Sequence, residues 1–154
     1  MMRENGNLRY TTLLFDVDNT LLNFDASEEE AFKSLLLHFG MEPKDSLLQE
    51  YHQINRSCWE LFEEGKIEKE EVLLRRFEIF FSRHNCQADG KEAEAFYRER
   101  LGDSAILIPG ALELCRDLSR KYDLYVVTNG VADTQYRRLK SSGLDPYFKG
   151  LFRL

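Results

Sequence analysis

Residues 11–15 form a short apolar run that stops abruptly at acidic residues. The run reads Thr-Thr-Leu-Leu-Phe, and Asp16 and Asp18 follow it directly. β-Prone, apolar residues over this length predict a strand that is buried on both faces of a parallel sheet. In open α/β sheets, ligands bind beyond the carboxyl ends of the strands. The sequence therefore predicts an α/β fold with a functional role for the residues after Phe15.

The stretch from about residue 24 to 104 has the apolar periodicity of helices instead. Ser27 and Glu30 form a capping-box pattern at its start, and Gly40 and Gly102 are predicted to end the first and the last helix. Amphipathic helices joined by short turns predict a small bundle. The helices are expected at about residues 27–39, 46–64, 72–85 and 93–101.

An α/β pattern returns after the helical stretch. Pro109-Gly110 opens a helix, residues 124–128 form a second buried strand, and a helix predicted to be capped by Asp133 ends at Gly143. A third strand is expected within residues 149–154. The predicted core therefore comprises residues 1–23 and 105–154, and an all-helical domain of residues 24–104 is inserted into it.

Composition limits the class of protein. The chain of 154 residues is 43% hydrophobic and 31% charged, with a net charge of −6. This balance is typical of a soluble globular protein and argues against nucleic acid or an anionic membrane as a partner. No apolar run approaches the roughly 18 residues of a membrane span, and residues 1–10 lack the apolar segment of a secretory signal.

The cysteines and histidines are scattered along the chain. Cys58, Cys86 and Cys115 form no CxxC motif or Cys/His cluster, which disfavours both a zinc site and a disulfide framework. Reduced thiols in a cytoplasmic protein are the expected state. The sequence does not indicate an oligomeric state.

Asp16 and Asp18 can divide the work of phosphoryl transfer. One carboxylate can attack phosphorus, while the other protonates the leaving oxygen and later deprotonates water. The structural alternative is that both are turn or cap residues, because aspartate is common in loops. The spacing of the two aspartates alone favours this structural role over catalysis.

The complete string changes this balance. Residues 13–21, Leu-Leu-Phe-Asp-Val-Asp-Asn-Thr-Leu, resemble the first motif of the haloacid dehalogenase superfamily. Residues 126–130, Val-Val-Thr-Asn-Gly, resemble its second motif, which implies that Thr128 donates its hydroxyl to the phosphate. Backbone N–H groups of Asn129 and Gly130 can add donors. Without the first motif, Thr128 would be interpreted as a residue that ends the strand and has no role in catalysis.

The resemblance implies a Rossmann-like core with a three-layer α/β/α parallel sheet, and an aspartyl-phosphate formed on Asp16. Phosphatases and phosphomutases of this superfamily carry an acid at the position of Asp18, whereas the dehalogenase and phosphonatase branches lack one. Mg²⁺ is also implied, held by the Asp16 carboxylate and the Asp18 main-chain carbonyl, with further ligands needed.

Two later motifs of the superfamily have no counterpart in this chain. They supply a Lys or Arg that offsets phosphate charge and acidic residues that complete the metal site. Lys140 and Lys149 fit better as solvated residues, and no acidic residue follows Asp145. The last two core strands are also missing, which would leave an edge and one face of the first strand unpaired. We therefore expect an incomplete core from a truncated enzyme with little or no turnover.

The helical insertion has the position of a cap that closes over the site and selects the substrate. Its second helix carries a mixed stripe that could stack on and hydrogen-bond a nucleobase: His52, Asn55, Trp59 and Phe62. Alternatively, Trp59 and Phe62 pack the bundle while the two polar residues face water, which is the commoner arrangement. Arg76 is predicted to be a solvated helix charge.

Residues 54–67 and Arg76-Phe77, together with residues 127–131 and 134–144, resemble the bacterial pyrimidine 5′-nucleotidase subfamily of the YjjG/YfnB type. This resemblance implies a phosphatase of nucleoside 5′-monophosphates, including non-standard pyrimidine ones. From the stripe on the second helix, Asn55 and Trp59 are predicted as substrate contacts. Two alternatives stay open at this point. One is a phosphatase of another small metabolite, such as phosphoglycolate or a sugar phosphate, and the other is a non-catalytic protein that uses the cap for binding. A receiver domain is disfavoured because its phosphoacceptor lies on a later strand.

Overall fold

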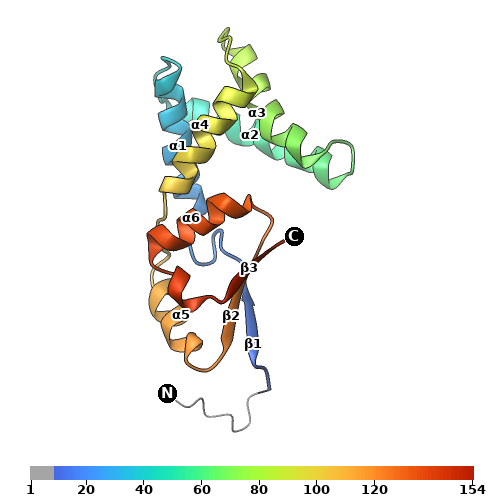
Figure 1. The fold of residues 1–154 in the computed structure, drawn as a ribbon. Coiled ribbons are helices and arrows are strands. Elements are labelled where there is room, and N and C mark those ends of the chain that lie inside the picture. The colour runs from blue at the N-terminus through green and yellow to red at the C-terminus, as the bar shows by residue number, and fades with distance from the viewer. Residues whose placement is uncertain (1–8) are drawn as a thin grey trace. The chain divides into compact units, whose positions relative to one another are not determined.

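The computed structural model describes residues 9–154, so most of the predicted polar segment of residues 1–10 lies outside the described residues. The chain divides into two compact units, one of residues up to Glu28 together with Leu101–Leu154 and the other of Glu29–Arg100. The first division, after Glu28, lies inside the helix that begins at Phe24, and the second, after Arg100, lies inside the helix that ends at Asp103. The predicted domain borders, 23/24 and 104/105, lie at the outer ends of the same two helices. The first unit is α/β and the second is helical (Figure 1).

The first unit contains a parallel sheet with the strand order β1-β2-β3. Phe15 of β1 pairs with Val126 of β2, whose neighbour on the other side is Leu151 of β3. Helix α5 precedes β2, and helix α6 with the short helix η1 connects β2 to β3. The elements are β1 (Thr12–Phe15), α5 (Ala111–Ser119), β2 (Asp123–Thr128), α6 (Ala132–Ser142), η1 (Asp145–Tyr147) and β3 (Gly150–Arg153).

Helices α5 and α6 cover one face of this sheet (Figure 1). Leu124, Val126 and Leu139 are among the buried residues of that interface. The opposite face carries Leu14, which is 64% exposed, and Phe152, which is 57% exposed. The prediction that the first strand is buried on both faces is therefore wrong for the described residues, because the covering helices lie on one side. Within residues 9–154, β1 lies at one edge of the sheet, with β2 as its neighbour.

The described residues thus form an α/β, Rossmann-like fold, and they supply the sheet and one helical layer of the predicted incomplete core. Helix α6 ends as predicted at Gly143, which has the left-handed φ of 82° that glycine tolerates best. Asp133 lies within the first turn of α6, so its prediction as the cap is wrong; Val131 occupies the N-cap position.

Four helices confirm the predicted bundle elements: α1 (Phe24–His38), α2 (Asp45–Glu63), α3 (Lys69–Arg83) and α4 (Gly90–Asp103). The predicted start of α1 is wrong. The side-chain oxygen of Asn23 accepts a hydrogen bond from the Ala26 N–H at 3.0 Å, whereas Ser27 is buried within the helix. Asn23 is therefore the N-cap of α1, a position at which asparagine is as favourable as serine. Gly102 lies inside α4 and does not end it.

Aromatic side chains fill the helical unit. The Tyr51 ring stacks on Phe32 at a centroid distance of 4.3 Å and on Phe77 at 5.5 Å. Stacked and edge-on rings of this kind add to the free energy of burying apolar surface. No helix within residues 9–154 combines the length and apolar character that crossing a membrane requires.

Candidate active site

The loop after β1 is held by its own backbone. Val17 is fully buried, and its carbonyl oxygen accepts hydrogen bonds from the N–H groups of Thr20, Leu21 and Leu22 at 3.2, 2.9 and 3.0 Å. Asn19 has a φ of 58°, a left-handed conformation that asparagine adopts more readily than most residues. The loop therefore turns sharply just after Asp18, which lies beside the buried Val17.

Asp16 and Thr128 lie at the same edge of the sheet. Phe15 and Val126 are register partners on adjacent parallel strands, so Asp16, just after β1, and Thr128, the last residue of β2, lie at the carboxyl ends of neighbouring strands. One carboxylate oxygen of Asp16 accepts a hydrogen bond from the Val17 N–H at 3.0 Å. Two of the predicted site residues therefore meet at the carboxyl ends of β1 and β2, where α/β folds bind ligands.

The hydroxyl oxygen of Thr128 accepts two hydrogen bonds. The Gly130 N–H and the side-chain nitrogen of Gln135 both lie 3.0 Å from Thr128 Oγ1, and Thr128 is 2% exposed. A hydroxyl has two lone pairs and one hydrogen. Since both lone pairs are engaged, the hydrogen remains to be donated. Gly130 therefore orients the hydroxyl through its backbone N–H, and Asn129 lies between the two residues.

Gln135 also joins Thr128 to Asp18. Its side-chain nitrogen lies 3.0 Å from Asp18 Oδ2. Arg138, one turn further along α6 and fully buried, forms an ion pair with Asp18 Oδ1. Neither Gln135 nor Arg138 was among the predicted site residues. The available signal was their spacing of three residues, which places both on one face of the helix after the second strand.

Asp16 and Asp18 offer oxygen donors that suit Mg²⁺. The ion is commonly held by one or two carboxylates, with water and substrate phosphate completing its shell. The side chain of Asp18 already accepts hydrogen bonds from Gln135 and Arg138, which favours its main-chain carbonyl over its carboxylate as a ligand. Within residues 9–154, no three His, Cys, Asp or Glu side chains gather closely enough to form a metal site by themselves.

Lys149 does not lie at this edge of the sheet. Its ammonium nitrogen is 2.9 Å from the carboxylate of Asp123, the first residue of β2, whereas Thr128 is the last. The expectation that Lys149 acts outside the phosphate site agrees with this geometry.

The predicted substrate residues Asn55 and Trp59 belong to the helical unit. Asn55 Oδ1 accepts a hydrogen bond from Arg76 at 3.1 Å, and the Trp59 ring contacts Phe62 edge-on at 5.7 Å. Both residues are half-buried. The described contacts of each are therefore made inside the bundle, and a role in substrate binding stays a prediction.

Arg76 is not the solvated charge that the sequence predicts. It is 4% exposed and lies 2.8 Å from the carboxylate of Glu94. Burial disfavours its charged form, but Tyr51, Glu94 and Tyr97 outweigh this effect, so the pKa of Arg76 lies above its usual range. The interior partner Glu94 on α4 could not be recognised from helical spacing on α3.

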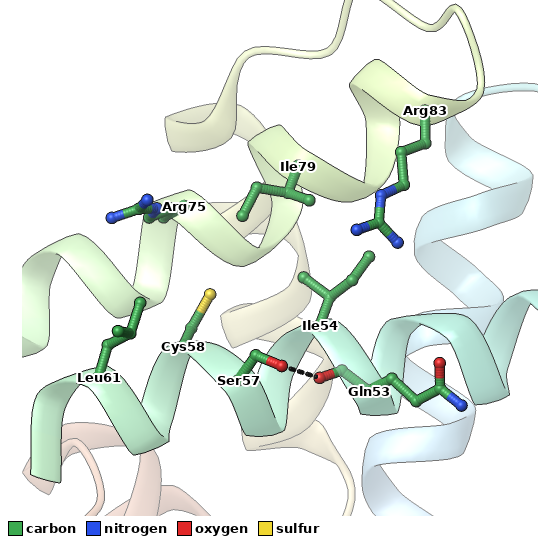
Figure 2. A pocket seen from close by; sticks show the side chains of 8 residues that line it. All are labelled: Gln53, Ile54, Ser57, Cys58, Leu61, Arg75, Ile79 and Arg83. Atoms are coloured by element: carbon green, nitrogen blue, oxygen red, sulfur yellow. Dashed lines mark hydrogen bonds between the residues drawn. The ribbon is translucent and has the colours of Figure 1, made fainter.

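A groove of about 240 Å³ lies between α2 and α3 (Figure 2). Cys58 and Ile54 line it beside Arg75 and Arg83, and the Ser57 hydroxyl donates a hydrogen bond of 3.0 Å to the Gln53 carbonyl. Burial raises the pKa of the Cys58 thiol. The groove is distinct from the predicted base-binding stripe, which shares none of its lining residues. The lining residues are Gln53, Ile54, Ser57, Cys58, Leu61, Arg75, Ile79 and Arg83.

Comparison with known proteins agrees with this geometry. Residues 10–153 match the family model of haloacid dehalogenase-like hydrolases. The chain is 43% identical over 144 residues to the HAD-hydrolase YfnB of Bacillus subtilis, covering 94% of this chain and 61% of YfnB. It is 38% identical to the pyrimidine 5′-nucleotidase PynA of Streptococcus pneumoniae, covering 93% and 61% of the two chains. The pyrimidine 5′-nucleotidase YjjG of Escherichia coli is 27% identical, with coverages of 92% and 61%.

A crystal structure of YfnB bound to magnesium superposes with a TM-score of 0.88 at 42% identity, covering 95% of this chain and 66% of that one. The chain thus spans about three-fifths of the length of the curated relatives it matches. The family model covers nearly all of it, including both strand ends of the site. The chain belongs to the haloacid dehalogenase-like hydrolase family.

Proposed function

We propose that this chain carries the phosphoryl-transfer residues of a magnesium-dependent phosphatase that hydrolyses nucleoside 5′-monophosphates. The observation that supports this most is that Asp16, Asp18 and Thr128 lie at the carboxyl ends of the adjacent strands β1 and β2. Gln135 links Asp18 to Thr128 by hydrogen bonds. Two relatives are named pyrimidine 5′-nucleotidases, which supports a pyrimidine nucleotide as the substrate.

In the first step, Asp16 attacks phosphorus. The Val17 N–H holds Asp16 Oδ1, so Oδ2 is the attacking oxygen. A bond forms between Asp16 and phosphorus while the bond to the nucleoside 5′-oxygen breaks, and Asp18 gives its proton to that oxygen. Each Asp18 oxygen accepts one hydrogen bond and keeps a second lone pair for this proton.

In the second step, water attacks the phosphorus of the aspartyl-phosphate. Asp18 takes the proton of the water as the bond between Asp16 and phosphorus breaks, and inorganic phosphate leaves. Thr128 donates its hydroxyl hydrogen to a phosphate oxygen in both steps. Mg²⁺, held by the Asp16 carboxylate and the Asp18 carbonyl, would neutralise phosphate charge when bound.

Substrate selection is assigned to the helical unit as a cap. We propose that Trp59 stacks on the base and that Asn55 hydrogen-bonds it. Replacing Trp59 with alanine should then raise KM for UMP and dUMP by about tenfold, because stacking of a base on an aromatic ring contributes ~1–3 kcal/mol. A panel with phosphoglycolate and sugar phosphates separates this assignment from a phosphatase of another small metabolite.

The assay measures magnesium-dependent phosphate release from UMP and dUMP. Because the chain spans 61% of its curated relatives, two forms are compared: the 154-residue chain, and the same chain joined to the part of YfnB that the match leaves uncovered. We expect turnover in the joined form and little or none in the shorter one. In the joined form, Asp16→Asn should abolish phosphate release without lowering the melting temperature. Release that persists in the Asp16→Asn variant, or its absence from both forms, would contradict the proposal.

A further inference from the structure

We infer that Gln135 and Arg138 are positioning residues that hold the Asp18 carboxylate for proton transfer. This inference rests on the proposed phosphatase function, since it assigns roles around the acid–base residue of that reaction. It concerns α6, whose polar side chains form and break no bond to the substrate in the proposed steps.

The contacts form a closed network. Arg138 Nη1 pairs with Asp18 Oδ1, and Gln135 Nε2 donates to Asp18 Oδ2 at 3.0 Å. Arg138 Nη1 also donates to Gln135 Oε1 at 3.0 Å, which closes a ring of three side chains. Because each carboxylate oxygen has its own donor, rotation of the carboxylate about its Cβ–Cγ bond would break both contacts.

The same network reaches the phosphate-binding hydroxyl. Gln135 Nε2 lies 3.0 Å from Thr128 Oγ1 as well as from Asp18. An amide nitrogen has two hydrogens, so it can serve both acceptors at once. The position of the acid–base carboxylate is thereby tied to the position of the phosphate donor.

A buried arginine at position 138 is unfavourable for the stability of the fold. It is fully buried, and its Nη2 has no hydrogen-bond partner within residues 9–154. A buried guanidinium with an unmade hydrogen bond is costly, and apolar side chains often replace buried ion pairs without loss of stability. Its neighbour Arg137 is 46% exposed at the side chain and pairs with Asp103. Arg138 Nε also donates to the Ser104 carbonyl at 3.2 Å, so the buried guanidinium serves that carbonyl and the Asp18 carboxylate, which is its one charged partner among the described residues.

The first test uses the 154-residue chain and needs no turnover. Carboxyl groups are labelled with a carbodiimide and an amine, and the rate is measured at each site by mass spectrometry. Gln135→Met and Arg138→Met should each raise the labelling rate of Asp18 at least fivefold, and Arg138→Lys should raise it less. Asp117, on α5, should not change. The matched control Arg137→Met should raise labelling at Asp103 and leave Asp18 unchanged.

Two outcomes of this test would overturn the inference. One is an unchanged labelling rate of Asp18 in both the Gln135→Met and the Arg138→Lys variants. Gln135→Met retains the side-chain volume and Arg138→Lys retains the charge, so these two variants are expected to fold. The other is an equal rise at Asp18 and Asp117, because general loosening of the fold would expose all carboxylates alike.

The second test uses leaving groups of different quality in the active form of the assay above. The alkoxide of UMP needs a proton from Asp18, whereas the phenolate of p-nitrophenyl phosphate leaves without one. Gln135→Met should lower kcat/KM for UMP about 10–100-fold and that for the aryl ester less than about threefold. Equal losses for both esters would contradict positioning. Absence of turnover from the parent enzyme would instead contradict the proposed function, and the labelling result would still decide the roles of Gln135 and Arg138.

Discussion

Asp18 and Thr128 accept hydrogen bonds from the same side-chain nitrogen, Gln135 Nε2, which lies 3.0 Å from an oxygen of each. Asp18 follows the first strand and Thr128 ends the second, so their side chains meet only because β1 and β2 are parallel neighbours. The third member, Gln135, comes from the first turns of α6. At the carboxyl ends of β1 and β2, one side-chain amide therefore holds both polar side chains in a fixed arrangement.

The Asp18–Arg138 pair should affect stability through the buried partner. Asp18→Ala leaves the guanidinium of Arg138 buried without its counter-ion, and we expect a loss of about 2 kcal/mol in the free energy of unfolding, below the usual cost because the Asp18 side chain is 31% exposed. The double variant with Arg138→Met should be more stable than Asp18→Ala alone. Urea denaturation measures both values. Asp103→Ala, which removes the exposed partner of Arg137, is the control and should cost less than about 0.5 kcal/mol.

Glu94 should be essential to the helical unit. Glu94→Gln removes the charge that compensates buried Arg76, and the free energy of unfolding should fall by about 3 kcal/mol. Glu29→Gln breaks the exposed pair with Lys33 and should change stability by less than about 0.5 kcal/mol. Similar small effects of both substitutions in urea denaturation would show that Arg76 finds other compensation.

The buried thiols should make stability depend on alkaline pH. Burial raises the pKa of Cys115 from its ordinary value of 9.0 to about 11. Between these values the unfolded chain ionises its thiol while the folded chain does not, so stability should fall as pH rises from 9 to 11. Cys115→Ala should flatten this part of the curve, and an unchanged slope would contradict the assignment.

Thiol labelling gives an independent measurement of the same burial. Cys58 and Cys115 are buried, whereas Cys86 is partly exposed. At pH 8, a disulfide reagent should modify Cys86 first, and the other two only at the rate of unfolding. Denaturant should make all three react at similar rates. Rapid modification of Cys115 in the folded protein would show that the core opens locally.

The uncovered face of the sheet should bind apolar probes. Leu14 is the register partner of Tyr125, whose ring lies 5.6 Å from that of Phe152. Exposed apolar patches of this kind bind dyes such as anilinonaphthalene sulfonate. Leu14→Thr with Phe152→Thr should lower the dye fluorescence severalfold while keeping β-propensity. Leu114→Thr on α5 is a control for an isolated exposed leucine and should have little effect.

Local sequence patterns predicted most of the elements. The helical periodicity and the strand–Asp-x-Asp pattern depend on neighbours within a few residues, so they can be recognised without a fold. One of the wrong predictions concerns two residues that could both cap the same helix. Asn23 and Ser27 are both good N-caps, and only the path of the loop from Asn19 decides that Asn23 is used.

What the sequence determined by itself is the order of the chemical groups: a strand followed by Asp16 and Asp18, and a second strand ending in Thr128. The tertiary structure decided which distant side chains hold them. Gln135 and Arg138 lie 117 and 120 residues from Asp18, and their contacts exist only after β1 pairs with β2 and α6 packs on the sheet. Likewise, Arg76 on α3 is buried because α4 brings Glu94 to it. Periodicity specifies which face of a helix is polar, but the partner of a buried charge depends on packing between elements, which no local pattern encodes.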